Sequence, residues 1–245
     1  MKRQTFIDYS GVILVSLAIT FISAAFGFFQ FFLENDAEDS TVSVNNCKND
    51  VTLVIDAGHG GEDGGAVGIA GSLEKDINLE IANLVKSYIS LTDINYKMTR
   101  DGDYLLYEQG QENRKKFYDL RGRLEICNNQ KQPIFLSIHQ NKFPLQKYKG
   151  LQVYYSKSSN SYELATIIQS KTAKFLQKDN SRKTKEAGRN IYILNNANCP
   201  AVLVECGFLS NTEDEANLNN FEYQKKLAFI MFSSVMDYLY KENYT

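Results

Sequence analysis

The pattern of hydrophobic and polar positions divides the chain into three parts. Residues 11–33 read GVILVSLAITFISAAFGFFQFFL without a charged residue, and this run is long enough to cross a bilayer as a helix. Residues 34–50 are rich in Asp, Glu, Ser and Asn and have no apolar period, which predicts an acidic flexible linker. We therefore expect an N-terminal membrane segment within residues 1–33 and one globular domain over residues 51–245.

Short apolar or alternating runs in the C-terminal part predict six strands. These are VTLVID (51–56), INYKMT (94–99), PIFLSI (133–138), GLQVYY (150–155), RNIYIL (189–194) and AVLVEC (201–206). Apolar positions with helical spacing lie between them, from Ile77 to Ile89, from Leu164 to Phe175 and from about Phe221 to Glu242. This alternation predicts an α/β domain with a mostly parallel central sheet and helices on both faces.

The charges that flank the apolar run indicate the compartment of the domain. Lys2 and Arg3 precede the run and acidic residues follow it, so the positive-inside rule places the domain outside the cytoplasm, anchored to the cell membrane. A cleavable signal peptide is the alternative, because Ser23-Ala24-Ala25 offers small residues near a cleavage position. The uncleaved anchor is favoured because the apolar run continues beyond Ala25. Both alternatives export the domain.

Net charge and cysteine spacing exclude some classes and leave others open. The formal net charge of −2 provides no broad positive field, so a nucleic-acid partner is not expected. Cys47, Cys127, Cys199 and Cys206 match no zinc-ribbon spacing, and their disulfide state cannot be assigned from the sequence.

The two histidines, His59 and His139, each follow a predicted core strand. In open α/β sheets, sites form outside the carboxyl ends of the strands, where Asp56 and Glu205 are also expected. Two histidines and one carboxylate are the protein ligands of many catalytic zinc sites, which leave a fourth position to water. Such a site polarises a carbonyl and lowers the pKa of the water to about 7.

The carboxylates differ in how strongly the sequence singles them out. Glu205 closes a strand that is otherwise apolar, where a carboxylate is costly unless it is used or paired, and it could act as an acid and base beside the metal. Glu74 stands at the start of a predicted helix, where complementing the helix dipole is a sufficient explanation.

Two rival chemistries fit the sequence less well. The glycine-rich segment around His59 lacks the Gly-Lys-Ser/Thr of a phosphate-binding loop. A cysteine nucleophile is disfavoured because Glu205 and Cys206, as neighbours on a strand, face opposite sides of the sheet.

Six motifs, taken in order, carry a family resemblance. They are DAGHGGEDGGAVG (56–68), Leu73-Glu74-Lys75, Met98-Thr99-Arg100, Leu120-Arg121, SIHQN (137–141) and VECGFLSN (204–211). Over about residues 51–240 the chain resembles the zinc-dependent N-acetylmuramoyl-L-alanine amidases of the third amidase family.

The resemblance implies a site, a cofactor and a substrate. His59, Glu74 and His139 would bind Zn²⁺, and Glu205 would be the catalytic carboxylate. The substrate would be peptidoglycan, cut between N-acetylmuramic acid of the glycan strand and L-alanine of the stem peptide. Gln140 stands where many relatives have a small residue, and we expect it to narrow the site.

The arrangement of one domain behind a membrane segment looks most like the spore-cortex or germination-specific branch, whose members prepare muramic-δ-lactam sites in the developing spore. The anchor or a regulatory or targeting protein partner would then supply localisation. Two other functions stay open: a zinc peptidase or deacetylase of the cell envelope, and a catalytically silent domain that binds peptidoglycan or activates an enzyme. Retention of all four site residues argues against the silent domain.

Overall fold

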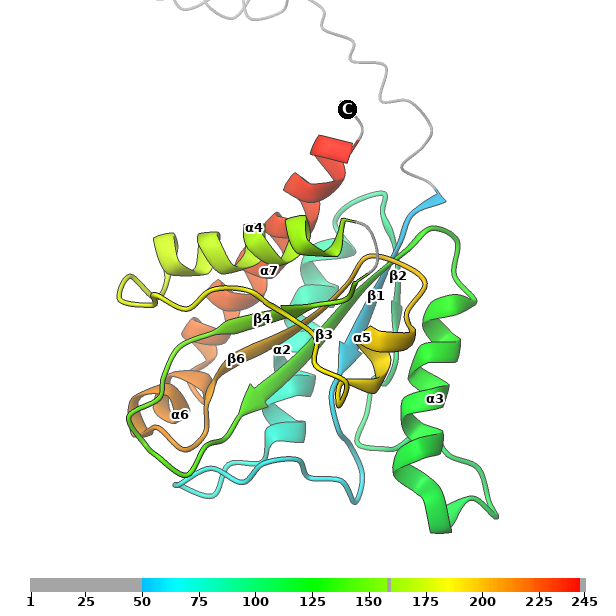
Figure 1. Ribbon diagram of the computed structural model, residues 1–245, viewed down its shortest axis with the longest axis horizontal. Helices are drawn as coiled ribbons and strands as arrows, with labels where there is room; N and C mark the ends of the chain where they lie inside the picture. The colour runs from blue at the N-terminus through cyan, green and yellow to red at the C-terminus, as the bar shows by residue number, and fades with distance from the viewer. Residues whose placement is uncertain (1–49, 158–159, 243–245) are drawn as a thin grey trace, which may run out of the picture. The chain divides into compact units, whose positions relative to one another are not determined.

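The computed structural model describes residues 50–157 and 160–242, which form one mixed α/β domain around a six-stranded sheet (Figure 1). The strands are β1 Thr52–Ala57, β2 Asn95–Met98, β3 Pro133–Asn141, β4 Gln152–Tyr155, β5 Lys185–Glu186 and β6 Ala201–Phe208. The helices are α2 Glu74–Ile89, α3 Lys115–Asn128, α4 Ser161–Phe175, α5 Tyr192–Asn196, α6 Thr212–Leu218 and α7 Phe221–Glu242, with the 3-10 helix η2 at Glu112–Arg114.

The sheet has the order β2-β1-β3-β6-β4-β5 and is mostly parallel. The first four strands of that order run in the same direction, whereas β4 is antiparallel to β6 and β5 follows the direction of β4. The predicted fold class is therefore confirmed for the described residues. The carboxyl ends of β1, β3 and β6 meet at one edge of the domain. This is the edge at which His59, His139 and Glu205 are expected from the sequence.

Two apolar cores cover the two faces of the sheet, because successive residues of a strand point to opposite sides. Leu53 and Ile55 of β1 pack with α2, α4 and α7, while Val54 belongs to a smaller core with Phe135, α3 and α5. Figure 1 shows α5 in front of the sheet and α2 and α7 behind it. On the face of the smaller core, polar side chains near the carboxyl ends of the strands line a cavity.

One predicted strand is wrong. Residues 189–194 are expected to be extended, but 189–191 precede the single-turn helix α5 and 192–194 belong to it. Ile193 and Leu194 are both buried against α3, a pattern that an alternating strand cannot produce. The amide of Asn195 donates to the carbonyls of Gly188 and Ile191 and closes the turn, and β5 already occupies the edge of β4.

The predicted N-terminal anchor (residues 1–33) lies outside the described residues, as does the linker apart from residue 50. Within residues 50–157 and 160–242, every helix is too short or too polar to span a bilayer. No disulfide joins the cysteines of the described part, although Cys127 and Cys199 bring their sulfur atoms to 3.5 Å in the smaller core.

A buried ion pair between Asp56 and Arg123 links the end of β1 to α3. Asp56 accepts hydrogen bonds from Thr99 (2.7 Å), Ser137 (2.6 Å) and the Arg123 guanidinium (2.8 Å). Arg123 also donates to Asp119 one turn earlier in α3 (2.8 Å). Burial alone would raise the pKa of Asp56, but Arg123 and Ser137 bring it below the ordinary value. The pair is tolerated because each charge is fully hydrogen-bonded.

Two buried guanidinium groups hold the backbone of the loop that follows β1. Arg123 donates to the carbonyl oxygens of Ala57 (2.6 Å) and His59 (2.7 Å). Arg100 donates to the carbonyl of Ala57 (2.8 Å) and to that of Lys75 at the start of α2 (2.7 Å). The loop and the first turn of α2 are thereby fixed to each other.

Substitution of Arg123 by methionine should destabilise the domain by about 3–5 kcal/mol, because Asp56 would remain buried without its charged partner. Urea unfolding of the parent and variant measures the change. The matched control is Lys149→Met, which removes an exposed ion pair with Glu213 and should cost about 1 kcal/mol or less. A loss for Arg123→Met no larger than that of the control would contradict this role.

Candidate active site

His59 lies in a tight loop directly after β1. Its backbone has φ +63°, a left-handed conformation that costs a non-glycine residue energy and is typical of functional sites. Gly58 precedes it and donates its N–H to the carbonyl of Ile138 (3.1 Å). A Cβ atom on Gly58 would lie 2.3 Å from the ring of His139, so a side chain at this position would displace that imidazole.

Glu74 is the first residue of α2 and joins both histidines. Its Oε1 lies 3.2 Å from Nε2 of His59 and 3.0 Å from Nδ1 of His139, and accepts from the N–H of Gln140 (3.0 Å). Its Oε2 accepts from the N–H of Ala66 (2.8 Å). Burial opposes ionisation, but the two imidazoles lower the pKa of Glu74 far below its ordinary value. Glu74 is therefore a buried carboxylate held in its ionised form.

The candidate ligand atoms of His59, Glu74 and His139 all lie within 4.8 Å of one another. The two imidazole rings are 5.0 Å apart and nearly perpendicular, at 74°. The other nitrogen of His59, Nδ1, lies 2.9 Å from Oδ2 of Asp63. Burial lowers the pKa of His59, but Glu74 and Asp63 together raise it above the ordinary value. Asp63 was not singled out in the sequence, although its position four residues after His59 in one loop was a usable signal.

Glu205 projects from β6 on the same face of the sheet as His139, its register partner in β3. The strand continues to Phe208, past a register shift after His139, so Glu205 lies inside β6 rather than at its end. Among the described residues its buried Oε2 has no hydrogen-bond partner. Burial raises the pKa of Glu205 to about 7, with the charge of Glu74 contributing in the same direction. A partnerless carboxylate with such a pKa is suited to proton transfer.

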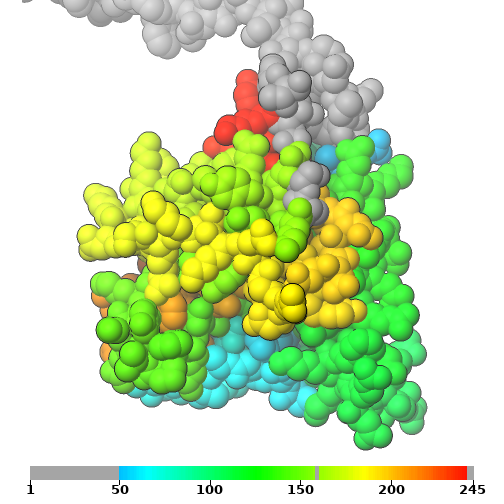
Figure 2. Space-filling model, viewed as in Figure 1, coloured from blue at the N-terminus to red at the C-terminus, as the bar shows by residue number. Residues whose placement is uncertain are grey.

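A cavity of about 680 Å³ opens beside His59, His139 and Glu205. Its walls come from α3, from Tyr154 of β4 and from the segment that carries β5 and α5. On the face shown in Figure 2, this segment (yellow to orange) lies next to α3 (green), with the loop after β1 (cyan) below them. The volume lies within the range that is typical of ligand sites.

Three other residues considered in the sequence have their side chains engaged away from the reacting centre. Asp56 is fully buried and its oxygens are engaged by the ion pair and hydroxyl groups described above. Cys206 belongs to the core on the opposite face, as predicted. The expectation that Gln140 narrows the site is wrong, because its buried side chain turns toward α2 and donates to Asn78 (3.1 Å).

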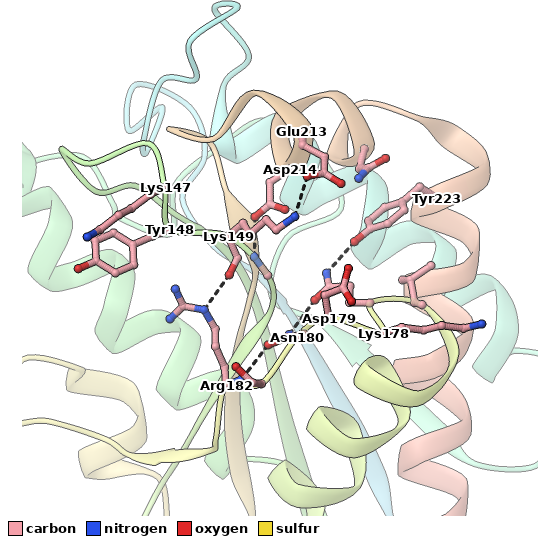
Figure 3. Close-up of a pocket in the computed structure, with 15 residues that line it drawn as sticks. Lys147, Tyr148, Lys149, Lys178, Asp179, Asn180, Arg182, Glu213, Asp214 and Tyr223 are labelled. Carbon is pink, nitrogen blue, oxygen red and sulfur yellow. Dashed lines mark hydrogen bonds and ion pairs between the residues drawn. The ribbon is translucent and has the colours of Figure 1, made fainter.

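A second cavity, of about 390 Å³, lies between the β3–β4 loop, the end of α4 and the start of α6. Figure 3 shows Lys149 facing Glu213 and Arg182 directed toward the backbone of Lys149. Lys149 pairs with Glu213 (2.8 Å), and Arg182 donates to the carbonyl of Lys149 (2.8 Å). Its lining contains no histidine, so the metal-ligand group lies with the first cavity.

Comparisons with known proteins agree with this arrangement. The family described as N-acetylmuramoyl-L-alanine amidase (Amidase_3) matches residues 53–235. A germination-specific N-acetylmuramoyl-L-alanine amidase of Bacillus subtilis is 36% identical over 189 residues, covering 76% of this chain and 78% of that protein.

Solved structures give the same result. The CwlD amidase from Clostridioides difficile, in complex with the GerS lipoprotein, is 36% identical with a TM-score of 0.72 and covers 77% of this chain and 98% of that one. The amidase AmiC2 of Nostoc punctiforme is 30% identical with a TM-score of 0.67, over 78% and 97% of the two chains. The chain therefore belongs to the N-acetylmuramoyl-L-alanine amidase family, is a peptidoglycan amidase by class, and resembles the spore-cortex branch.

Proposed function

We propose that the chain is a zinc-dependent hydrolase that cuts the amide bond between N-acetylmuramic acid and L-alanine, with Glu205 as its catalytic acid and base. The proposal puts the metal on His59, Glu74 and His139. The observation that carries it is the convergence of these three side chains, with ligand atoms within 4.8 Å, beside a partnerless carboxylate in the cavity.

The donor set fits zinc. Two imidazoles and one carboxylate are the protein ligands of a common type of catalytic zinc site. Asp63 lies at Nδ1 of His59 and would orient that ring so that Nε2 faces the other ligands, as carboxylates beside metal-bound histidines do. When bound, zinc supplies Lewis acidity that polarises the scissile carbonyl and lowers the pKa of water to about 7.

Glu205 performs the proton transfers in this proposal. Its Oε2 takes a proton from the attacking water and then delivers it to the nitrogen of L-alanine, which leaves as a free amine. A pKa of about 7 suits both steps, because the group is present in both protonation states near neutral pH. The surrounding walls keep this carboxylate from bulk water, which maintains the raised pKa.

The biological setting is part of the same proposal. The germination-specific relative supports a role in germination. Within this proposal the cut prepares muramic-δ-lactam sites in spore-cortex peptidoglycan. We place the domain outside the cytoplasm, tethered by residues 1–33. The solved complex of CwlD with a lipoprotein supports a protein partner for this chain as well.

The zinc-loaded full chain should release stem peptides with N-terminal L-alanine from purified peptidoglycan. Glu205→Gln should bind zinc in the same stoichiometry but lose activity by about 10²–10⁴-fold, because the proton acceptor is removed while the ligands remain. Metal analysis and mass spectrometry of the products measure both. Glu213→Gln, which alters an exposed carboxylate of the second cavity, is the matched control.

Several outcomes of that experiment would contradict the proposal. Cleavage within the stem peptide would identify a peptidase, and release of acetate a deacetylase. Zinc binding without any cleavage would favour the silent domain. Full activity of Glu205→Gln would exclude this residue as the acid and base.

In the metal-free protein, Glu205→Gln should raise the free energy of unfolding at high pH but not at low pH. Below about pH 4 the carboxyl is protonated in the folded and unfolded chain and contributes nothing. Between pH 4.5 and about 7 the unfolded chain ionises first, so unfolding becomes more favourable as pH rises. At pH 8 the variant should therefore be more stable than the parent, by about 3 kcal/mol at most. Urea unfolding in the presence of a chelator measures the difference, and an equal difference at pH 4 and pH 8 would contradict it.

A further inference from the structure

Two lysines without a carboxylate partner line the catalytic cavity from different elements. Lys116 lies in the first turn of α3 and Lys185 lies in β5, and both are exposed. Neither forms an ion pair with another part of the chain that the structure describes. We propose that Lys116 and Lys185 bind an acidic residue of the stem peptide, the D-glutamate that follows L-alanine, through its free carboxylate.

The position of Lys116 is unfavourable for the helix itself. Arg114, Lys115 and Lys116 follow one another at the start of α3, whose first turn contains no acidic residue. Cations are disfavoured there because the N-terminal end of a helix dipole is positive. Lys115 is compensated by Glu62 (2.6 Å), and Arg114 stacks over the ring of Phe117 (4.4 Å). Within the described residues Lys116 forms no ion pair, although its charge helps to lower the pKa of Asp63, and it is the one of the three that lines the cavity.

The register of the sheet places Lys185 on the same face as Glu205. Lys185 pairs with Tyr154 of β4, and Tyr154 pairs with Leu203, two residues before Glu205 in β6. Glu186, the acidic neighbour of Lys185, is paired with Lys157 (3.2 Å) and does not neutralise it. The cavity thus receives positive charge from β5 as well as from α3.

The expected ligand follows from the chemistry of the substrate, and this inference rests on the proposed function. With the scissile amide beside Glu205, the peptide continues from the nitrogen of that bond, and it would lie in the cavity that both lysines line. The residue after L-alanine is one residue length away, about 3.5 Å along an extended chain. A carboxylate at that residue matches two cations that have no partner of their own, while a neutral amide in its place does not.

The test compares two substrates that differ only in this charge. The zinc-loaded full chain is given glycan fragments whose stems carry either L-Ala-D-glutamate or L-Ala-D-isoglutamine, in which a neutral amide replaces the carboxylate. We expect a higher kcat/KM for the acidic stem. Lys116→Gln and Lys185→Gln should each lower kcat/KM for the acidic stem by about fivefold, the size typical of one exposed ion pair, mainly through KM. The neutral stem should be affected little.

The control is Lys178→Gln, which removes an exposed lysine of the second cavity and should leave both rates unchanged. Equal rates on the two stems by the parent, or equal losses on both stems in the lysine variants, would overturn the inference while leaving the amidase assignment intact. Cleavage of neither stem by the parent would instead contradict the proposed function on which the inference rests.

Discussion

The buried ion pair between Asp56 and Arg123 is the constraint on which the rest of the site depends. It lies where β1 ends, and Arg123 also donates to the carbonyl of His59, whose backbone is left-handed. Arg100 extends the same arrangement to Lys75 at the start of α2. Burying these charges is tolerated because each is hydrogen-bonded, and the result is a loop whose position relative to α2 is set by fixed donors. Without these contacts, nothing in this framework would fix the imidazole of His59 relative to the carboxylate of Glu74.

The same framework gives two carboxylates of the candidate site opposite shifts in pKa. Glu74 accepts from backbone N–H groups and contacts two imidazoles, so its pKa is held far below the ordinary value. Glu205 has a buried oxygen that finds no hydrogen-bond partner among residues 50–157 and 160–242, and burial raises its pKa to about 7. Pairs of acidic groups whose environments move their pKa values apart are typical of acid–base sites. An ionised ligand and a proton carrier are what zinc-assisted amide hydrolysis requires.

The sequence predicts the regular parts of this arrangement well and the irregular parts poorly. The helices α2 and α7 follow from periodicity because their buried residues recur with helical spacing. Five of the strands follow from short apolar runs instead, and β1 is buried at every position. His59, His139 and Glu205 follow from their places beside apolar runs, although the structure puts His139 and Glu205 inside β3 and β6 rather than at the strand ends. Glu74 is singled out through the family resemblance, because a carboxylate in a first helical turn has a sufficient structural explanation. Residues 189–194 were mistaken for a strand, and no pattern indicated that Arg123 would be buried. Both depend on contacts between segments far apart in the chain.

The central claim is that His59, Glu74 and His139 hold a zinc ion beside Glu205. Anomalous diffraction at the zinc absorption edge, from crystals of the zinc-loaded protein, tests it most directly. The account predicts one strong peak at about 2.0–2.2 Å from Nε2 of His59, Nδ1 of His139 and a carboxylate oxygen of Glu74. A peak bound elsewhere in the chain, or none at these three side chains, would contradict it.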